Sequence, residues 1–135
     1  MAESDKARDT RSWWEKFYND SPYIVYLEDS HKYDIEEASD FLSGKLELTP
    51  GDTAFDQCCG IGSLSLFLAQ RGIKIYGCDI ATSMIAKAQA DALALGVQDI
   101  TQYSVADAFS YTSPTPADAA FNWYTSFGYA EDEQN

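Results

Sequence analysis

Apolar runs and amphipathic stretches alternate along the second part of the chain. Four short runs rich in β-branched and aromatic residues predict strands over residues 53–58, 73–78, 100–105 and 117 to 123 or 124. Two stretches of helical periodicity separate the first three runs, over residues 63–71 and 82–95, and Gly72 and Gly96 follow them as helix ends. Strands that alternate with crossover helices favour a parallel sheet with helices on its faces. The pattern therefore predicts an α/β fold over residues 49–135.

Two helical patterns lie within the first 48 residues, on either side of an apolar run of unclear type over residues 23–27. Ser12 and Glu15 form a possible capping box, and four aromatic residues follow at helical spacing, namely Trp13, Trp14, Phe17 and Tyr18. Such a stripe either packs into a core or covers a ligand, and the sequence leaves both interpretations open. A second helix is expected over residues 33–43, with Gly44 at its C-terminal end and with inward positions at Ile35, Ala38, Phe41 and Leu42. We therefore expect an N-terminal helical cap over residues 1–48.

Length, charge and cysteine content narrow the class of protein. The chain has 135 residues, the size of one domain, and it shows no membrane-spanning run or leader, so a cytoplasmic protein is expected. Nine basic against 22 acidic residues give a net charge of −13, which repels phosphate backbones and anionic lipids. We therefore expect neither nucleic acid nor membrane as a partner. The three cysteines form no C-x-x-C pair and His31 is the only histidine, so no metal site is expected.

A glycine-rich turn follows the first predicted strand. Gly60 and Gly62 come just after Asp56 and allow a tight turn that a ligand can approach closely. Asp79 ends the next predicted strand, where an acid can accept hydrogen bonds from both hydroxyls of a ribose. A dinucleotide site would have a third glycine at the position of Ser65. The pattern therefore predicts a nucleoside ligand without a pyrophosphate.

These segments resemble the motifs of the class I S-adenosylmethionine-dependent methyltransferases. The first motif runs approximately D-x-G-C-G-x-G; Cys58 stands at its first glycine, and the residues that fit it are Asp56, Cys59, Gly60 and Gly62. Asp79 fits the acid that ends the second motif. Residues 105–108 are similar to the family's segment after the third strand, and residues 121–129 to its fourth strand and following loop. The chain is thus identified as the N-terminal part of the family fold, an incomplete Rossmann-like parallel sheet with an N-terminal helical cap.

The resemblance implies S-adenosylmethionine as cofactor and methyl transfer as activity. It implies that Asp79 binds the ribose, Asp107 the adenine amino group and Asp56 the amino group of the methionine part. The full set expected at the cofactor is Asp56, Cys58, Cys59, Gly60, Gly62, Asp79, Ile80, Met84, Asp107, Ala108, Trp14, Tyr18 and Tyr26. The residues expected at the acceptor are Asn122, Tyr124 and Thr125, for which strand-end packing is the alternative.

The expected acceptor is a nitrogen or oxygen atom of a small molecule. The resembled fold continues beyond its fourth strand, whereas this sequence ends soon after it, so a fragment, a split enzyme and a reduced fold are all open. An uncovered strand edge favours self-association or a complementing chain. Two other functions also stay open. One is a non-catalytic nucleoside-binding module completed by a partner chain, and the other is a nicotinamide oxidoreductase fragment, which Ser65 disfavours.

Overall fold

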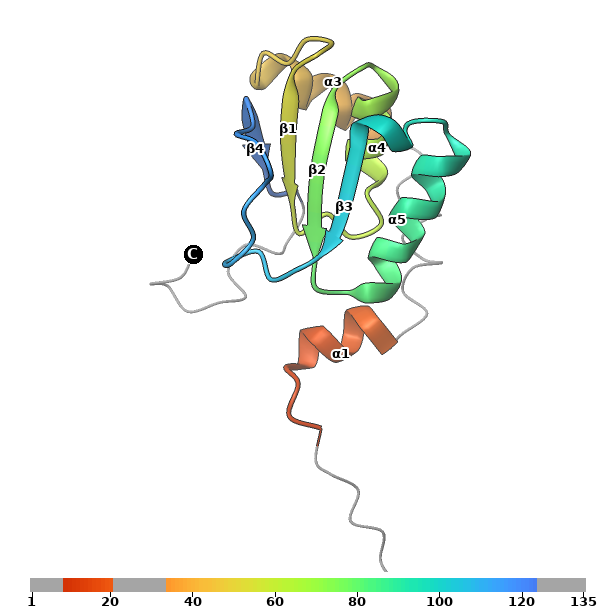
Figure 1. Ribbon diagram of the computed structural model, residues 1–135, viewed down its shortest axis with the longest axis vertical. Helices are drawn as coiled ribbons and strands as arrows, with labels where there is room; N and C mark the ends of the chain where they lie inside the picture. Colours follow the sequence, from red (N-terminus) through yellow and green to blue (C-terminus); the bar gives the residue numbers. More distant parts are fainter. Residues whose placement is uncertain (1–8, 21–33, 124–135) are drawn as a thin grey trace, which may run out of the picture.

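The computed structural model of the chain describes residues 9–20 and 34–123 (Figure 1). Its helices are α1 (Trp13–Asp20), α3 (Ile35–Lys45), α4 (Ser63–Gln70) and α5 (Thr82–Ala94), with a short 3-10 helix η1 (Gln98–Ile100). Its strands are β1 (Thr53–Gln57), β2 (Lys74–Asp79), β3 (Thr101–Val105) and β4 (Ala119–Phe121). Each predicted strand and helix is present, with ends shifted by a few residues. Within the described ranges, no helix is long and apolar enough to cross a membrane.

The strands form one parallel sheet in the order β3-β2-β1-β4. Asp56 of β1 is in register with Gly77 of β2 and with Phe121 of β4, and Gly77 is in register with Tyr103 of β3. Residues in register on neighbouring strands point to the same face, so these four form one row across the sheet. In this order β4 lies at an edge, the position from which self-association was expected.

Three helices cover one face of the sheet (Figure 1). α4 and α5 pack against β2, α5 also packs against β3, and α3 packs against α4. The core between these helices and the sheet is apolar and includes Leu42, Ala54, Leu64, Leu68, Ile75, Ile85, Ala88 and Phe121. Because α3 contributes Leu42 to this core, it folds with the sheet, although the expected boundary at residue 48 assigns it to the cap.

The loop of residues 106–118, which follows β3, lies against the opposite face of the sheet. Tyr111 of this loop stacks on Phe55, with ring centroids 5.3 Å apart and an interplanar angle of 18°. The Thr115 hydroxyl lies 3.0 Å from the hydroxyl of Tyr76. The loop is therefore held by both an aromatic contact and a hydrogen bond.

Three details of the predicted helices are wrong. Ser63 is the first residue of α4 and not its cap, because the cap position is Gly62, with φ of +73° and no side-chain cap. α3 continues through Gly44 and ends at Lys45. Phe41 and Leu95 were expected to point inward but are 54% and 46% exposed. Helix periodicity alone does not reveal which side of α3 packs against α4, nor that α5 ends at Ala94, one residue before Leu95.

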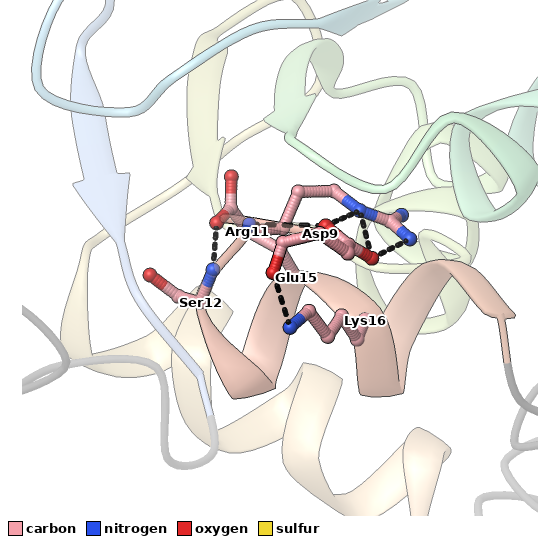
Figure 2. A network of polar contacts seen from close by, with 5 residues as sticks. All are labelled: Asp9, Arg11, Ser12, Glu15 and Lys16. Atoms are coloured by element: carbon pink, nitrogen blue, oxygen red, sulfur yellow. Dashed lines mark hydrogen bonds and ion pairs between the residues drawn. The ribbon is translucent and has the colours of Figure 1, made fainter. Parts of the chain in front are cut away.

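α1 lies below the carboxyl ends of the strands and contacts α5 (Figure 1). The backbone N–H of Ser12 donates to Glu15 Oε2 at 2.6 Å, which is one half of the predicted capping box. Arg11 forms an ion pair with Asp9 at 2.7 Å, and Lys16 Nζ donates to the backbone oxygen of Asp9 at 3.1 Å (Figure 2). These contacts fix the start of α1. The helix lies near the carboxyl ends of the strands, where parallel α/β folds bind ligands (Figure 1).

Candidate cofactor-binding site

The turn between β1 and α4 is built from left-handed backbone. Cys58, Gly60 and Gly62 have φ of +55°, +57° and +73°. Glycine adopts this conformation freely, whereas at Cys58 it costs about 1–2 kcal/mol. The N–H of Cys59 donates to the carbonyl of Cys78 at 2.9 Å and ties the turn to β2. Since Gly62 offers no side-chain cap, the first N–H groups of α4 remain available to an anionic group.

Asp79 joins this turn to the loop between β2 and α5. Its Oδ2 accepts the N–H of Gly60 at 2.9 Å, and its Oδ1 accepts the N–H of Ala81 at 2.9 Å. Burial raises the pKa of Asp79, and hydrogen bonds from Ala81, Gly60 and Ile80 oppose that rise. A carboxylate offers about four acceptor sites. Asp79 therefore shapes the turn and can still accept hydrogen bonds from a ligand.

Asp56 lies on the helix-covered face of the sheet, in the same region as Asp79. It is 4% exposed, and burial raises its pKa to about 7; the nearby Ser65 hydroxyl lowers the pKa, and the charge of Asp79 raises it. Ser65 of α4 is itself fully buried, and its Oγ lies 2.9 Å from the hydroxyl of Tyr103 and 3.3 Å from the carbonyl oxygen of Gly62. A buried acid thus shares a polar cluster with two hydroxyl groups.

Gly77 makes room for this cluster. A Cβ atom on Gly77 would lie 2.6 Å from Cδ1 of Tyr103 and 3.2 Å from Sγ of Cys59. A Cβ atom on Gly62 would lie 3.0 Å from the Tyr103 hydroxyl. The Tyr103 ring therefore passes over Gly77, reaches Ser65 on α4 and supports the glycine turn from below.

Burial keeps two thiols at this end of the sheet, Cys59 and Cys78, in their neutral form. Burial raises the pKa of Cys59 well above its usual value, and it raises the pKa of Cys78 to about 12. Cys58, Cys59 and Cys78 form no disulfide within the described part of the chain. In the part of the chain that the structure describes, no group of histidine, cysteine and acidic residues could hold a metal ion.

Two apolar residues follow Asp79, as expected for a site that binds a base beside a ribose. Ile80 is half-buried, and Met84 is 2% exposed. The Met84 Sδ would lie 3.7 Å from a Cβ atom on Gly60, so it packs beneath the turn. A contact of either residue with the adenine stays a prediction.

Asp107 and Ala108 follow β3 at the same end of the sheet. The N–H of Ala106 donates to the backbone oxygen of Asp79 at 3.0 Å, which brings this loop next to the end of β2. Asp107 is exposed, and its Oδ1 accepts the N–H of Phe109 at 2.9 Å. The side chain thus closes its own turn, and its expected role toward adenine stays a prediction.

Asn122 follows β4 and lies beside the end of β1. Its Nδ2 donates to Oε1 of Gln57 at 3.3 Å, whereas its Oδ1 is buried and has no hydrogen-bond partner in the described part of the chain. A buried acceptor without a donor costs about 1–3 kcal/mol. The expected role of Asn122 at the acceptor stays a prediction.

The rest of the predicted site lies outside the residues that the structure describes. This holds for Tyr26, Tyr124 and Thr125, and for the side chains of Trp14 and Tyr18 in α1. Sequence reasoning in turn missed four residues that the structure brings to the site, namely Gln57, Ser65, Gly77 and Tyr103. A glycine inside a predicted strand indicates that another group packs closely against it. Gly77 could therefore have indicated the contact with Tyr103.

The match to known proteins agrees with this geometry. A family model described as a methyltransferase domain matches residues 54–135. The chain belongs to this methyltransferase family. The resemblance to class I S-adenosylmethionine-dependent methyltransferases and the Rossmann-like fold are confirmed, although the match begins at β1 and leaves out the N-terminal helices.

Three similar proteins show how much of a methyltransferase this chain spans. Magnesium-protoporphyrin O-methyltransferase of Synechocystis sp. is 35% identical over 79 residues, which is 56% of this chain and 34% of that protein. The uncharacterized RNA methyltransferase BH0687 of Halalkalibacterium halodurans is 41% identical over 61 residues, 45% of this chain and 13% of that protein. The crystal structure of an S-adenosylmethionine-dependent methyltransferase from Geobacter sulfurreducens in complex with S-adenosyl-L-homocysteine is 29% identical, with a TM-score of 0.60 over 76% of this chain and 43% of that one. The chain therefore spans about a third or less of the length of these two curated relatives.

These relatives contradict the expected partners. We expected a small-molecule acceptor and no nucleic acid, yet one relative is an RNA methyltransferase, and further RNA methyltransferases match as well. The prediction relied on the net charge of −13, which is a sum over the whole chain. The matched segment makes up only 13% of the RNA methyltransferase BH0687. The charge of this chain therefore does not describe the surface on which such a protein binds RNA. The partner expectation is therefore not retained.

Proposed function

We propose that this methyltransferase chain binds S-adenosylmethionine at the glycine turn and is the cofactor-binding portion of an enzyme that methylates a nitrogen or oxygen atom. The observation that supports this best is the position of Asp79. Its carboxylate fixes Gly60 and Ala81 on either side, so the turn and the loop after β2 converge on one acid.

The cofactor's ribose fits the acceptor capacity that remains on Asp79. The N–H groups of Gly60 and Ala81 occupy two of its roughly four acceptor sites, and the N–H of Ile80 also lowers its pKa, so the capacity that remains suits a ribose hydroxyl. Gly60 and Gly62 adopt the left-handed backbone of the turn, and the sides on which their side chains would stand are filled by Met84 and Tyr103 beneath it.

The methionine part of the cofactor fits the start of α4. Its carboxylate suits the uncapped N–H groups and the positive end of the helix dipole. Its ammonium and sulfonium groups are cationic, and a cation bound here would favour the charged form of Asp56, whose pKa burial raises to about 7, and of Asp79. No basic group is among those that shift the pKa of either acid.

Methyl transfer requires the protein to align the cofactor and the acceptor, and it requires no nucleophile from the protein. When bound, the cofactor supplies a methyl group on a sulfonium centre, and a lone pair of the acceptor displaces it in line while the sulfur becomes a thioether. The chain's own residues have to hold the two reactants aligned and keep water out. Asn122 Oδ1, just after β4, has no donor among the described residues and suits an N–H or O–H group of the acceptor.

α1 is proposed to act as a lid over this end of the sheet. It lies below the carboxyl ends of the strands and contacts α5 (Figure 1). Trp13 and Phe17 are 64% and 41% exposed in α1, which fits a covering element better than a core element.

Binding of the cofactor product tests the proposal. We expect isothermal titration of the full chain to show binding of S-adenosylhomocysteine and much weaker binding of NAD. Asp79→Ala should lose roughly 1.5–3 kcal/mol of binding, about a 10- to 150-fold weaker dissociation constant. Asp118→Ala is the matched control, because Asp118 Oδ2 also accepts a backbone N–H, from Thr53 at 2.8 Å, but at the opposite end of β1. Tighter binding of NAD, or equal losses in both variants, would contradict the proposal.

The acceptor class needs a separate assay. Formation of S-adenosylhomocysteine would be followed with RNA, a magnesium porphyrin, and a panel of amines and phenols, since relatives of this chain act on RNA and on a porphyrin. Turnover with any of them supports the enzyme. Cofactor binding without turnover across the whole panel would favour the non-catalytic binding module.

A further inference from the structure

The two ends of the glycine turn are held in different ways. At its start, the N–H of Cys59 donates to the carbonyl of Cys78 at 2.9 Å, and the N–H of Gly60 donates to Asp79 Oδ2 at 2.9 Å. Both contacts join the turn to β2. At its end, the N–H of Gly62 donates to the carbonyl of Cys59 at 2.9 Å, which is a hydrogen bond within the turn. Contacts from other elements therefore determine how firmly Gly62 is held.

Two buried hydroxyl groups supply such contacts. Ser65 Oγ donates to the carbonyl oxygen of Gly62 at 3.3 Å, and it lies 2.9 Å from the hydroxyl of Tyr103. A serine hydroxyl has one hydrogen and a carbonyl oxygen only accepts, so the Tyr103 hydroxyl is the donor to Ser65. Burial raises the pKa of Tyr103 well above its usual value, so this hydroxyl keeps its hydrogen. The three residues thus form a hydroxyl relay that runs from Tyr103 of β3 through Ser65 of α4 to Gly62.

The Tyr103 side chain is held tightly in this position. Its ring passes over Gly77 of β2, where a Cβ atom would lie 2.6 Å from Cδ1 of the ring. Its far end reaches Gly62, where a Cβ atom would lie 3.0 Å from the hydroxyl oxygen. Gln89 of α5 donates to the backbone oxygen of Tyr103 at 2.9 Å. Because Tyr103 is 5% exposed and Ser65 is fully buried, the hydroxyl relay is shielded from water.

The hydroxyl relay ends at the residue from which α4 begins. The carbonyl of Gly62 also accepts the N–H of Leu66 at 2.8 Å, and Gly62 caps α4 without a side chain. Glycine has little conformational preference of its own, so its contacts determine where the first N–H groups of the helix point. The relay therefore acts on the part of the site assigned to the methionine part of the cofactor, whereas Asp79 lies at the part assigned to the ribose.

We propose that Tyr103 and Ser65 are positioning residues that fix Gly62 and the start of α4, and that they thereby determine how strongly the site prefers ligands that carry the amino-acid part of the cofactor. The inference rests on the proposed function, because it requires the methionine part to bind at the start of α4. Neither residue touches the cofactor in this account, and both act through the backbone of Gly62.

Two ligands separate the hydroxyl relay from the rest of the site. S-adenosylhomocysteine carries adenine, ribose and the amino-acid part, whereas methylthioadenosine lacks the amino-acid part. Isothermal titration of the full chain gives the dissociation constant of each, with displacement titration where binding is weak. Tyr103→Phe keeps the ring and removes the hydroxyl, so it should weaken S-adenosylhomocysteine binding roughly 3- to 10-fold and methylthioadenosine binding less than about twofold. Ser65→Ala removes the middle of the relay and should change the ratio at least as much.

A double variant tests whether the two hydroxyl groups act together. In a Ser65→Ala background, Tyr103→Phe should weaken S-adenosylhomocysteine binding little further, because the relay is already broken. Independent losses that multiply in the double variant would contradict a relay. If Ser65→Ala does not fold, Tyr103→Phe and the two ligands alone decide the question.

Two matched variants separate this role from general packing. Ser39→Ala removes another fully buried serine hydroxyl, which donates to the carbonyl of Ile35 in α3 at 2.7 Å. Tyr76→Phe removes another tyrosine hydroxyl, which lies 3.0 Å from that of Thr115 on the opposite face of the sheet. Both should leave the two dissociation constants in place.

The outcomes distinguish this inference from the proposed function. Absence of S-adenosylhomocysteine binding by the wild-type chain overturns both. Binding that Tyr103→Phe and Ser65→Ala leave unchanged, or weaken equally for the two ligands, overturns the positioning role and leaves the proposed function standing. A change of the same size in the Ser39 and Tyr76 variants also overturns the positioning role.

Discussion

The substitution Gly77→Ala tests how tightly the Tyr103 ring packs against β2. The added Cβ would lie 2.6 Å from Cδ1 and 2.8 Å from Cε1 of the Tyr103 ring, distances that carbon atoms in proteins do not tolerate. The ring is 5% exposed, so it cannot turn toward solvent without leaving the core. A displacement of roughly 1 Å is needed to restore ordinary contact. That movement would also break the 2.9 Å contact between Tyr103 and Ser65.

The size of the effect follows from three contributions. Forcing extra volume into a packed core costs about 1–3 kcal/mol, and a lost hydrogen bond costs about 1 kcal/mol. Replacing a glycine inside a strand stabilises the folded state by about 0.5–1 kcal/mol, because alanine reduces the conformational freedom of the unfolded chain. We therefore expect Gly77→Ala to lower the free energy of unfolding by about 1–3 kcal/mol.

Urea denaturation followed by far-ultraviolet circular dichroism measures this difference. Gly44→Ala in α3 is the matched control, since nothing lies within 4 Å of its added Cβ and its φ is not positive; it should be neutral or stabilise by up to about 1 kcal/mol. In a Tyr103→Leu background, where the ring is absent, the cost of Gly77→Ala should fall by at least half. An equal cost in both backgrounds would refute the steric argument.

Three further predictions concern the turn, the buried acid and α1. Cys58→Gly should raise the free energy of unfolding by about 1 kcal/mol, because Cys58 has a left-handed backbone with φ of +55°. Glu47→Gly, at φ of +53°, is the matched comparison. If urea denaturation shows that Cys58→Gly is destabilised, the side-chain contacts of Cys58 outweigh the backbone strain. Because burial raises the pKa of Asp56 from 3.8 to about 7, the stability that this group contributes is full below pH 3.8 and lost as the pH rises to about 7. Stability of Asp56→Asn should therefore fall less between pH 4 and pH 8 than that of the wild type, and equal slopes would contradict the pKa shift. Deleting residues 1–20 should weaken binding of S-adenosylhomocysteine while the cooperative melt persists, and loss of that melt would favour core packing.

The sheet was predictable because its residues repeat simple patterns. The runs that became β1, β2 and β3 are short, apolar and separated by amphipathic stretches, and their ends were predicted to within one residue. β4 is shorter than predicted, because apolar residues beyond Phe121 extend the pattern without continuing the pairing with β1. The glycine turn and Asp79 were found because their positions at strand ends follow from the same pattern.

The polar cluster could not be predicted from local patterns. Ser65 was interpreted only as the absence of a third glycine, although in the structure its hydroxyl meets Tyr103, which lies 38 positions away in the chain. The pair Gln57 and Asn122 is separated by 65 positions. Such contacts depend on strand order and on the face to which each side chain points. The partner prediction failed for a different reason, because total charge does not locate an acceptor surface.

Mapping of backbone amide chemical shifts by NMR during titration of the full chain with S-adenosylhomocysteine tests the central claim most directly. We predict that the largest changes fall on the amides of Gly60, Gly62, Asp79 and Ala81, which surround the turn at the carboxyl ends of β1 and β2. The amides of Gly51 and Lys74, at the opposite end of the sheet, should remain in place. Changes confined to that opposite end, or no change at saturating ligand, would contradict a cofactor site at the glycine turn.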